Sequence, residues 1–399
     1  MNTRQQPIPR AMKAATIRRS RYGPPASAFQ FEQVPVPSPG PGQVLVQVMA
    51  AGINFNGVWA AMGAPVDVIG HQGRAGPVPD YHIAGSDASG IVVGVGDDSA
   101  NVKIGDAVVI SCGQYPHHAD CNRFDPGIGP TIWGYESNHG AFAEYALVDA
   151  YQCHPKPRHL TWEAAACFLL TGATAYRQLM SWPPHTVGPS DVVLIWGGAG
   201  GLGSAAIQLV RHQGGIPVAV VSSPGRASYC QSLGALTLDR SGFTHWEHAP
   251  GDDTVRTEEM RRFGRAIWEL TGTGASPHIV LEHSGSLTLG TSLYVCAPGG
   301  MVVTCGATSG FNCAVDLRHL WMRQKRLQGS HFATVEECAR VVELVAQGSL
   351  DPCLSLVFPF DRIGEAHQLM HDNRHPPGNM ALLVAAPAAG LGIGHGQLS

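Results

Sequence analysis

The sequence predicts an α/β protein with two domains, a small mostly-β domain and a doubly wound parallel sheet. Three observations support this fold class. At 399 residues the chain is too long for one ordinary core and suits two domains of common size. Short β-like runs occupy the first 150 residues. At 191–223 a strand, a glycine cluster, a helix and a second apolar strand follow one another, which is the order of a βαβ unit.

Alternating apolar and polar residues predict the strands of the first domain. The stretch PVPSPGPG at 35–42 breaks regular structure, and QVLVQVMAAGI at 43–53 then alternates in the β manner. Similar short runs follow at 90–96, 106–111 and 143–148. These runs are too short and too closely spaced for helices, so we expect a small domain dominated by strands.

The boundary between the domains is expected where a helical pattern begins. From Thr161 the sequence has helical periodicity, with Thr161 as the N-cap and Glu163 in the first turn, where a carboxylate suits the helix dipole. From about Asp351 to Val384 the chain returns to strand-like runs that would rejoin the first domain. The expected limits are therefore 1–160 with 351–399 for the mostly-β domain and 161–350 for the parallel sheet.

A glycine cluster between a buried strand and a helix predicts a dinucleotide site. Without side chains the backbone can approach a pyrophosphate, and the helix N-terminus supplies N–H donors and a favourable dipole. A purely structural tight turn is the alternative, but the complete βαβ setting favours binding. The expected contacts are Gly198, Ala199, Gly200, Gly201 and Leu202.

The residues after the second strand favour NADPH over NADH. A site for NADH usually offers a carboxylate to the ribose hydroxyls there, whereas this chain has Ser222, Ser223 and Arg226. Arg226, helped by Arg240, can pair with a 2′-phosphate. The alternative for Arg226 is a solvated residue in the first turn of a helix.

Composition and charge exclude several function classes. The formal net charge of −4 gives no basic field for nucleic acid or an anionic membrane. No signal-like or transmembrane run is evident, and the ten cysteines are scattered without a paired framework, which is typical of reduced thiols in a cytoplasmic protein. The tail at 385–399 looks weakly ordered.

A small β domain followed by a dinucleotide fold resembles the medium-chain dehydrogenase/reductase family, whose first domain is GroES-like. Its alcohol-dehydrogenase branch needs a thiolate and a His–Glu pair for zinc, but here AAGINFNGVWA at 50–60 and AGSDASG at 84–90 occupy those places. A further polar cluster suits a loop better than a metal site, namely His117, His118, Asp120 and Cys121. We therefore expect no metal and hydride addition to a polarised double bond.

Within that family the chain is similar to the crotonyl-CoA carboxylase/reductase group of enoyl-CoA reductases. The resemblance runs from about Ala51 to Gly392 and rests on long blocks in matching order: INFNGVWA (53–60), IWGYE (132–136), HLTWEAAA (159–166), IWGGAGGLGS (195–204), WMRQKRLQGSHFA (321–333) and PGNMALLV (377–384). It implies that NADPH gives hydride to the β carbon of an enoyl-CoA and that the enolate takes up CO2 at the α carbon, which yields an alkylmalonyl-CoA.

The resemblance also assigns catalytic residues. Asn56 is the amide and His331 the imidazole that hold CO2, and Glu136 is a carboxylate that orders a water. Taken singly, Asn56 fits a helix cap, Glu136 a surface ion pair and His331 a core histidine. Tyr135 stands where many relatives have phenylalanine: either its backbone N–H serves the CO2 pocket, or its ring excludes water and the hydroxyl then favours protonation.

The remaining assignments concern cofactor and substrate. Thr174 and Tyr176 are expected near the nicotinamide or in helix packing, and His283 is also expected at the cofactor. Arg318 and His319 are candidates for CoA, with Lys325 and Arg326 as weaker ones. The resemblance implies a homo-oligomer, a dimer or tetramer. Three functions stay open: a reductive carboxylase, a non-carboxylating enoyl-CoA reductase, and a quinone-reductase-like or non-catalytic NADPH-binding protein.

Overall fold

The computed structural model describes residues 7–72, 79–99, 102–115, 122, 129–244 and 253–394. The chain divides into two compact units. Unit 1 comprises Met1–Leu170, Thr334–Gln347 and Leu354–Ser399, and unit 2 comprises Thr171–Ala333 and Gly348–Cys353. The domain limits expected from the sequence, at 160/161 and 350/351, stay predictions.

Unit 1 is built on a seven-stranded sheet whose longest strand is β3 (Gln43–Ile53). The register along β3 places valines 44, 46 and 48 in the core, as period-2 alternation requires. The other strands are β5 (Ala88–Val95), β6 (Ala107–Ile110), β9 (Tyr145–Asp149), β10 (Cys153–Pro155), β17 (Leu354–Pro359) and β18 (Asn379–Leu383). A second sheet has the order β2 (Gln30–Pro35), β1 (Ala11–Ile17), β4 (His82–Ile83), and β7 (Gly113–Gln114) pairs with β8 (Thr131–Ile132).

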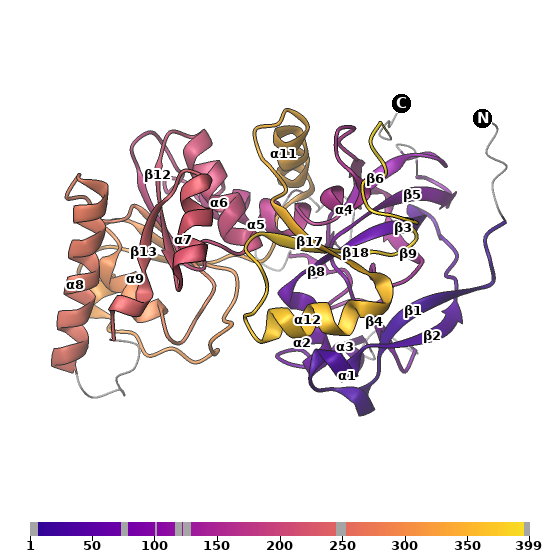
Figure 1. The fold of residues 1–399 in the computed structure, drawn as a ribbon, viewed down its shortest axis with the longest axis horizontal. Coiled ribbons are helices and arrows are strands. Elements are labelled where there is room, and N and C mark those ends of the chain that lie inside the picture. Colours follow the sequence, from indigo (N-terminus) through magenta and orange to yellow (C-terminus); the bar gives the residue numbers. More distant parts are fainter. Residues whose placement is uncertain are drawn as a thin grey trace. The chain divides into compact units, whose positions relative to one another are not determined.

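Short helices complete unit 1 (Figure 1). They are α1 (Pro25–Ala28), α2 (Phe55–Met62), α3 (Val68–Gln72), α4 (Trp162–Ala165), α11 (Val335–Ala346) and α12 (Ile363–His371), with 3-10 turns at Arg19–Arg21, Ala150–Gln152 and Phe360–Arg362. The expected N-cap is confirmed, because the Thr161 hydroxyl accepts a hydrogen bond from Ala164 N at 3.3 Å. The helical pattern that begins there forms two helices rather than one, since α4 ends at Ala165 and α5 begins at Leu169.

Unit 2 is a six-stranded, all-parallel sheet, and the predicted doubly wound fold is confirmed. The strand order is β13 (Leu236–Asp239), β12 (Ile216–Val221), β11 (Val192–Ile195), β14 (Ile279–Glu282), β15 (Met301–Thr304) and β16 (Arg326–Gly329). The central strands are buried along their whole length, as expected for a sheet covered on both faces. The helices are α5 (Leu169–Met180), α6 (Gly201–His212), α7 (Pro224–Ser232), α8 (Asp253–Thr271), α9 (Leu289–Val295) and α10 (Arg318–Trp321), with a 3-10 turn at Arg240–Gly242.

The core of unit 2 lies between this sheet and helices α8 and α9. The rings of Trp196 and Phe263 stack with their centroids 5.6 Å apart, and Phe243 meets Phe263 edge to face. Valines from β12, β14 and β15, namely Val218, Val280 and Val302, are fully buried in the same cluster. This packing holds the carboxyl ends of the strands in fixed positions, which is where ligands bind in sheets of this kind.

The tail is ordered as far as residue 394, and the expectation of weak order is wrong for that stretch. Lys156 is 1% exposed, and its ammonium donates to Gly392 O at 2.9 Å. Gly390 N donates to the Glu163 carboxylate at 2.7 Å, and Trp162 N donates to Leu391 O at 2.8 Å. Burial lowers the pKa of Lys156 to about 8. A glycine- and alanine-rich composition does not reveal such tertiary contacts.

No helix in the described part of the chain is long and apolar enough to cross a bilayer.

Candidate functional site

The glycine turn after β11 is required by close packing. A Cβ on Gly203 would lie 2.5 Å from Gly197 O, and one on Gly198 would lie 2.5 Å from the Cβ of Ala219. Gly197 itself has a φ of 59°, which favours glycine. Gly200 precedes the first residue of α6 and makes no side-chain cap, so the N–H groups of the first turn, including those of Gly201 and Leu202, keep the orientation that binds phosphates.

His283 covers this turn from the end of β14. Its Nε2 lies 3.0 Å from Trp196 O, and the same nitrogen would lie 2.6 Å from a Cβ on Gly197. The next residue back, Glu282, is buried and accepts hydrogen bonds from Thr288 Oγ1 at 2.8 Å and from Ser292 Oγ at 2.6 Å. Glu282 cannot be recognised from the sequence, because a carboxylate inside an apolar strand gives no signal until its partners are known. It fixes the backbone that carries His283.

Two arginines stand at the carboxyl ends of β12 and β13. Ser223 is the N-cap of α7, and its hydroxyl accepts from Arg226 N at 3.4 Å, while Ser222 is exposed. Burial lowers the pKa of the Arg226 guanidinium, and the neighbouring charge of Arg240 lowers it further. The two guanidinium groups repel one another, and a bound phosphate dianion would relieve this repulsion.

The other residues expected near the nicotinamide lie on α5. Thr174 is buried and Tyr176 is half-buried. Gln178, one turn after Thr174, donates to Val303 O of β15 at 3.5 Å. The helix is therefore joined to the sheet at this level.

In unit 1, Asn56 is the second residue of α2. The helix begins after Asn54, so Asn56 is not its capping residue. The Asn56 amide nitrogen lies 3.5 Å from Ser86 Oγ, at the long end of hydrogen bonding, and Ser86 is buried. Ser86 was not singled out from the sequence, since a serine in AGSDASG is indistinguishable from an ordinary small residue.

Tyr135 and Glu136 belong to a tight turn that follows β8. Glu136 Oε2 accepts from Ile132 N at 2.8 Å, and Ile132 O accepts in return from Tyr135 N at 3.1 Å and Glu136 N at 2.8 Å. Gly134 has a φ of 68°, and a Cβ there would lie 2.0 Å from Gly85 O. The turn therefore packs backbone to backbone on Gly85, so that the loop carrying Tyr135 and Glu136 contacts the loop whose Ser86 faces Asn56.

The Tyr135 side chain is 5% exposed and packs on Trp59 of α2, with the ring centroids 6.2 Å apart. The backbone N–H of Val66 lies close enough to its hydroxyl to lower the pKa of the phenol, but two larger effects outweigh this contact. Burial, with a smaller contribution from the Glu136 carboxylate, raises the pKa of Tyr135. The phenol is therefore neutral at ordinary pH and a weak acid.

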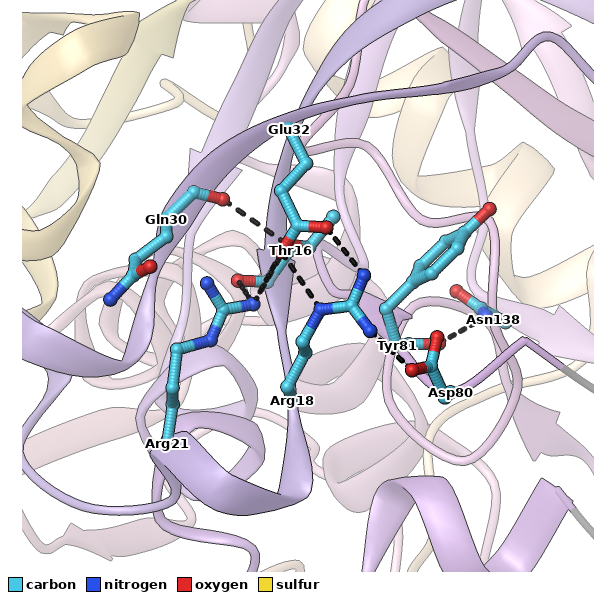
Figure 2. A network of polar contacts seen from close by, with 8 residues as sticks. All are labelled: Thr16, Arg18, Arg21, Gln30, Glu32, Asp80, Tyr81 and Asn138. Atoms are coloured by element: carbon cyan, nitrogen blue, oxygen red, sulfur yellow. Dashed lines mark hydrogen bonds and ion pairs between the residues drawn. The ribbon is translucent and has the colours of Figure 1, made fainter.

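A polar network braces this region from the N-terminal sheet (Figure 2). Glu32 accepts from Thr16 Oγ1 at 2.7 Å, Arg18 Nη2 at 2.6 Å and Arg21 Nη2 at 2.8 Å, and these partners lower the pKa of Glu32 to about 2. Arg18 also pairs with Asp80.

Asn138 joins the network to the Glu136 turn. Its amide donates to Tyr81 O at 2.9 Å and accepts from Ile83 N at 2.7 Å (Figure 2). Asn138 lies two residues after Glu136, so β4 and the turn that carries the carboxylate are held together. Neither Asn138 nor the Arg18 group was predicted, because their partners are distant in the sequence.

His331 and the residues expected at CoA lie in unit 2. His331 is exposed and follows β16. Arg318 has a side chain 72% exposed and pairs with Asp316 at 2.7 Å. His319 packs edge to face on Tyr294, with centroids 4.9 Å apart.

The two weaker CoA candidates have partners inside unit 2. Lys325 donates to Leu293 O at 2.6 Å, near the end of α9. Arg326 donates to Gln328 Oε1 at 2.6 Å. Both side chains thus have structural roles.

No group of three or more His, Cys, Asp or Glu among the described residues is arranged to hold a metal. His117, His118, Asp120 and Cys121 lie outside the described residues. Asp87, at one of the two places where zinc ligands would stand, is fully buried and accepts from Leu170 N at 3.2 Å. Burial raises the pKa of Asp87 well above its ordinary value.

Comparisons with known proteins agree with this geometry. Residues 40–158 match the alcohol dehydrogenase GroES-like domain, and residues 201–347 match the zinc-binding dehydrogenase family. A crotonyl-CoA carboxylase/reductase of Cereibacter sphaeroides is 47% identical over 96% of this chain and 90% of that protein. The solved structure of the crotonyl-CoA carboxylase/reductase AntE with NADP is 53% identical over 96% of both chains, with a TM-score of 0.89. That of the 2-octenoyl-CoA carboxylase reductase CinF with NADP and 2-octenoyl-CoA is 36% identical over 97% of this chain and 91% of that one, with a TM-score of 0.88.

Proposed function

This chain belongs to the crotonyl-CoA carboxylase/reductase family, and from that premise we propose that it converts a 2-enoyl-CoA and CO2 into an alkylmalonyl-CoA at the expense of NADPH. The observation that carries the proposal is the packing of the Gly134 turn, which carries Glu136, on the Gly85 loop, whose Ser86 contacts Asn56 in unit 1. An amide and a carboxylate held there have no part in binding a dinucleotide, whereas they suit CO2 and an ordered water.

The residues of unit 2 fit NADPH. The packed glycines leave a cradle that a Cβ would fill, and Arg226 with Arg240 supplies the charge for a 2′-phosphate. When bound, NADPH supplies the hydride for the β carbon of the enoyl thioester. The backbone N–H groups at the start of α6 would hold the pyrophosphate, and His283 would lie over the turn beside it.

Carboxylation requires that CO2 be held and that protons be kept from the enolate. CO2 has no charge and no permanent dipole, so weak hydrogen bonds at fixed positions are the means of holding it. We assign the Asn56 amide and the His331 imidazole to CO2, and the Glu136 carboxylate to an ordered water. The Ser86 hydroxyl then limits the rotation of the Asn56 amide.

Two roles are considered for Tyr135, a backbone N–H at the CO2 pocket and a ring that excludes water. Its contacts favour the second role. Its backbone N–H donates to Ile132 O, so it is engaged within its own turn. The buried ring fills space beside Trp59, which excludes water from that side of α2. Because burial raises the pKa of the phenol, the hydroxyl is a poor proton donor to an enolate, and tyrosine at this position is compatible with carboxylation.

The CoA moiety is assigned to Arg318 and His319. The Arg318 guanidinium is well exposed and held in place by Asp316, and it presents a fork that matches phosphate oxygens. Binding of CoA would then compete with the Asp316 carboxylate for this side chain.

A non-carboxylating enoyl-CoA reductase is the second candidate, and the Tyr135 hydroxyl favours it, because it places a hydroxyl where many relatives have phenylalanine. The test is to incubate the chain with NADPH and a 2-enoyl-CoA, with and without bicarbonate and carbonic anhydrase, and to weigh the products. An added carboxyl at saturating CO2 is expected. Its absence selects the plain reductase, and no NADPH consumption with any enoyl-CoA excludes both functions and leaves a quinone-reductase-like protein.

We also propose that the chain forms a homo-oligomer, a dimer or tetramer, in the cytoplasm. Strand β16 is the last strand of its sheet, and exposed apolar side chains lie on it and before it, including Trp321 (67% exposed), Met322 and Leu327. A second copy would cover this edge. Light scattering on the purified chain tests it, since a monomer at micromolar concentration would contradict the proposal.

A further inference from the structure

The Tyr229 hydroxyl joins α6 and α7, the two helices whose first turns carry the proposed cofactor residues. Tyr229 lies one turn after Arg226 on α7, and its Oη is 3.1 Å from Ser204 Oγ in the first turn of α6. The Ser204 hydroxyl donates to Gly200 O at 2.8 Å, which engages the single proton of the serine. Tyr229 is therefore the donor in its contact with Ser204, and the chain of hydrogen bonds ends on the carbonyl of the glycine turn.

Helix α7 also packs on the glycine turn through Cys230, the residue after Tyr229. A Cβ on Gly198 would lie 3.5 Å from Cys230 Sγ, and Cys230 is buried. Helices α6 and α7 both lie beside β12 (Figure 1), and the Tyr229 contact joins them to one another. A slide of α7 along α6 would break this hydrogen bond, since it joins the two helices.

The segment Gly348–Cys353 also contacts Tyr229, through Cys353. Cys353 lies close enough to the tyrosine hydroxyl to change its pKa, and Gln208 of α6 donates to Cys353 Sγ at 3.3 Å. Gln208 also accepts from Asp351 N at 2.8 Å and donates to Asp351 O at 3.1 Å. The segment Gly348–Cys353 is thus fastened to α6, and Tyr229 is held between this segment and Ser204.

We propose that Tyr229 is a positioning residue for cofactor selectivity: it fixes α7 against the glycine turn, so that Arg226 meets the 2′-phosphate while α6 holds the pyrophosphate. This rests on the proposed function in one respect, that NADPH is the cofactor and Arg226 binds its 2′-phosphate. Pairing between arginine and phosphate depends steeply on geometry. NADH lacks that phosphate, so its binding does not depend on the placement of Arg226.

The test is the equilibrium binding of NADPH and NADH to the full-length chain, followed by the fluorescence of the reduced nicotinamide. Tyr229→Phe removes one hydroxyl and keeps the ring. We expect the Kd for NADPH to rise roughly three- to tenfold, the effect of one hydrogen bond, with the Kd for NADH within about twofold of the wild type. In the background of Arg226→Ala the same change should add little, because Tyr229 acts through Arg226.

The matched control is Ser228→Ala, which removes a hydroxyl of the same helix that donates only to Pro224 O, at 3.1 Å, and it should leave both Kd values unchanged. If Tyr229→Phe does not fold, Ser204→Ala removes the same hydrogen bond together with the one to Gly200 O, and the Kd for NADPH is expected to rise more than the Kd for NADH. Equal weakening of both cofactors, or none, in a wild type that prefers NADPH overturns this inference alone. A wild type without preference for NADPH overturns the cofactor assignment and this inference together.

Discussion

Units 1 and 2 build their functional residues in different ways. In unit 2 the proposed cofactor site is formed mainly by backbone: packed glycines, the N-terminus of α6 and the carboxyl ends of buried apolar strands. In unit 1 the proposed functional groups are side chains: the Asn56 amide contacts Ser86 of another loop, and the Glu136 carboxylate accepts from Ile132 within its own turn. The difference shows which parts of a site can be recognised in a sequence and which need tertiary contacts.

The largest expected effect comes from a glycine of unit 2. Gly203→Ala places a Cβ 2.5 Å from Gly197 O and 2.6 Å from Gly198 Cα, both backbone atoms that cannot move away freely. Overpacking of this kind costs about 1–3 kcal/mol, so we expect the Kd for NADPH to rise by about tenfold or more. Titration of the variant with NADPH measures this. An unchanged Kd would show that the turn does not bind the cofactor.

A tightly packed glycine of unit 1, Gly134, should separate carboxylation from NADPH binding. Gly134→Ala combines a φ of 68° with a Cβ 2.0 Å from Gly85 O, and we expect a destabilisation of about 2–4 kcal/mol with loss of carboxylation. Binding of NADPH should stay within about twofold, since that site is in unit 2. Urea unfolding, NADPH titration and product analysis check the three results. Loss of NADPH binding in a folded variant would contradict the division of labour between the units.

Acid should weaken unit 1 before unit 2. The histidines that are buried among the described residues, His82, His154 and His367, all belong to unit 1. Burial lowers the pKa of His82 to about 3, and the pKa values of His154 and His367 to about 4. The unfolded chain, whose histidines titrate near about 6.5, binds more protons in this range. The stability they provide is therefore complete above about pH 6.5 and is lost as the pH falls towards 4.

Hydrogen–deuterium exchange at pH 7.5 and pH 5, corrected for the intrinsic rate, measures this difference. Amides of β3, β5 and β18 should lose protection at the lower pH by up to about 1.4 kcal/mol per pH unit for each histidine, while those of β11 and β14 keep theirs. Equal losses in both sheets would show that the buried histidines of unit 1 do not cause the sensitivity.

The same contrast explains which structural features can be predicted from the sequence. The βαβ order, the glycine turn, the Thr161 cap and the strand at 43–53 are signals carried by neighbouring residues, and the structure contains them. The order of the tail depends on Lys156, Glu163 and Trp162, more than 200 positions away, and composition gives no hint of it. Local patterns specify elements, but they do not specify which polar groups meet across them.

The proposed functional residues divide along the same line. Asn56, Glu136 and His331 were identified through a resemblance of whole blocks, because an isolated asparagine, glutamate or histidine has no distinctive spacing. Ser86, Asp87, Asn138 and Tyr229 were missed, since each gains its role from a partner in another loop or helix. Arg226 was found because it follows a strand and a cap, which are local signals.

The most direct test of the account is the fate of isotopically labelled bicarbonate when the wild type, Asn56→Leu and His331→Asn reduce an enoyl-CoA with NADPH and carbonic anhydrase. The account predicts a labelled alkylmalonyl-CoA as the main product of the wild type. It predicts a shift towards unlabelled, simply reduced acyl-CoA in both variants while NADPH oxidation continues, because neither residue binds the dinucleotide. An unlabelled product from the wild type at saturating CO2, or an equal loss of label and NADPH oxidation in the variants, would contradict it.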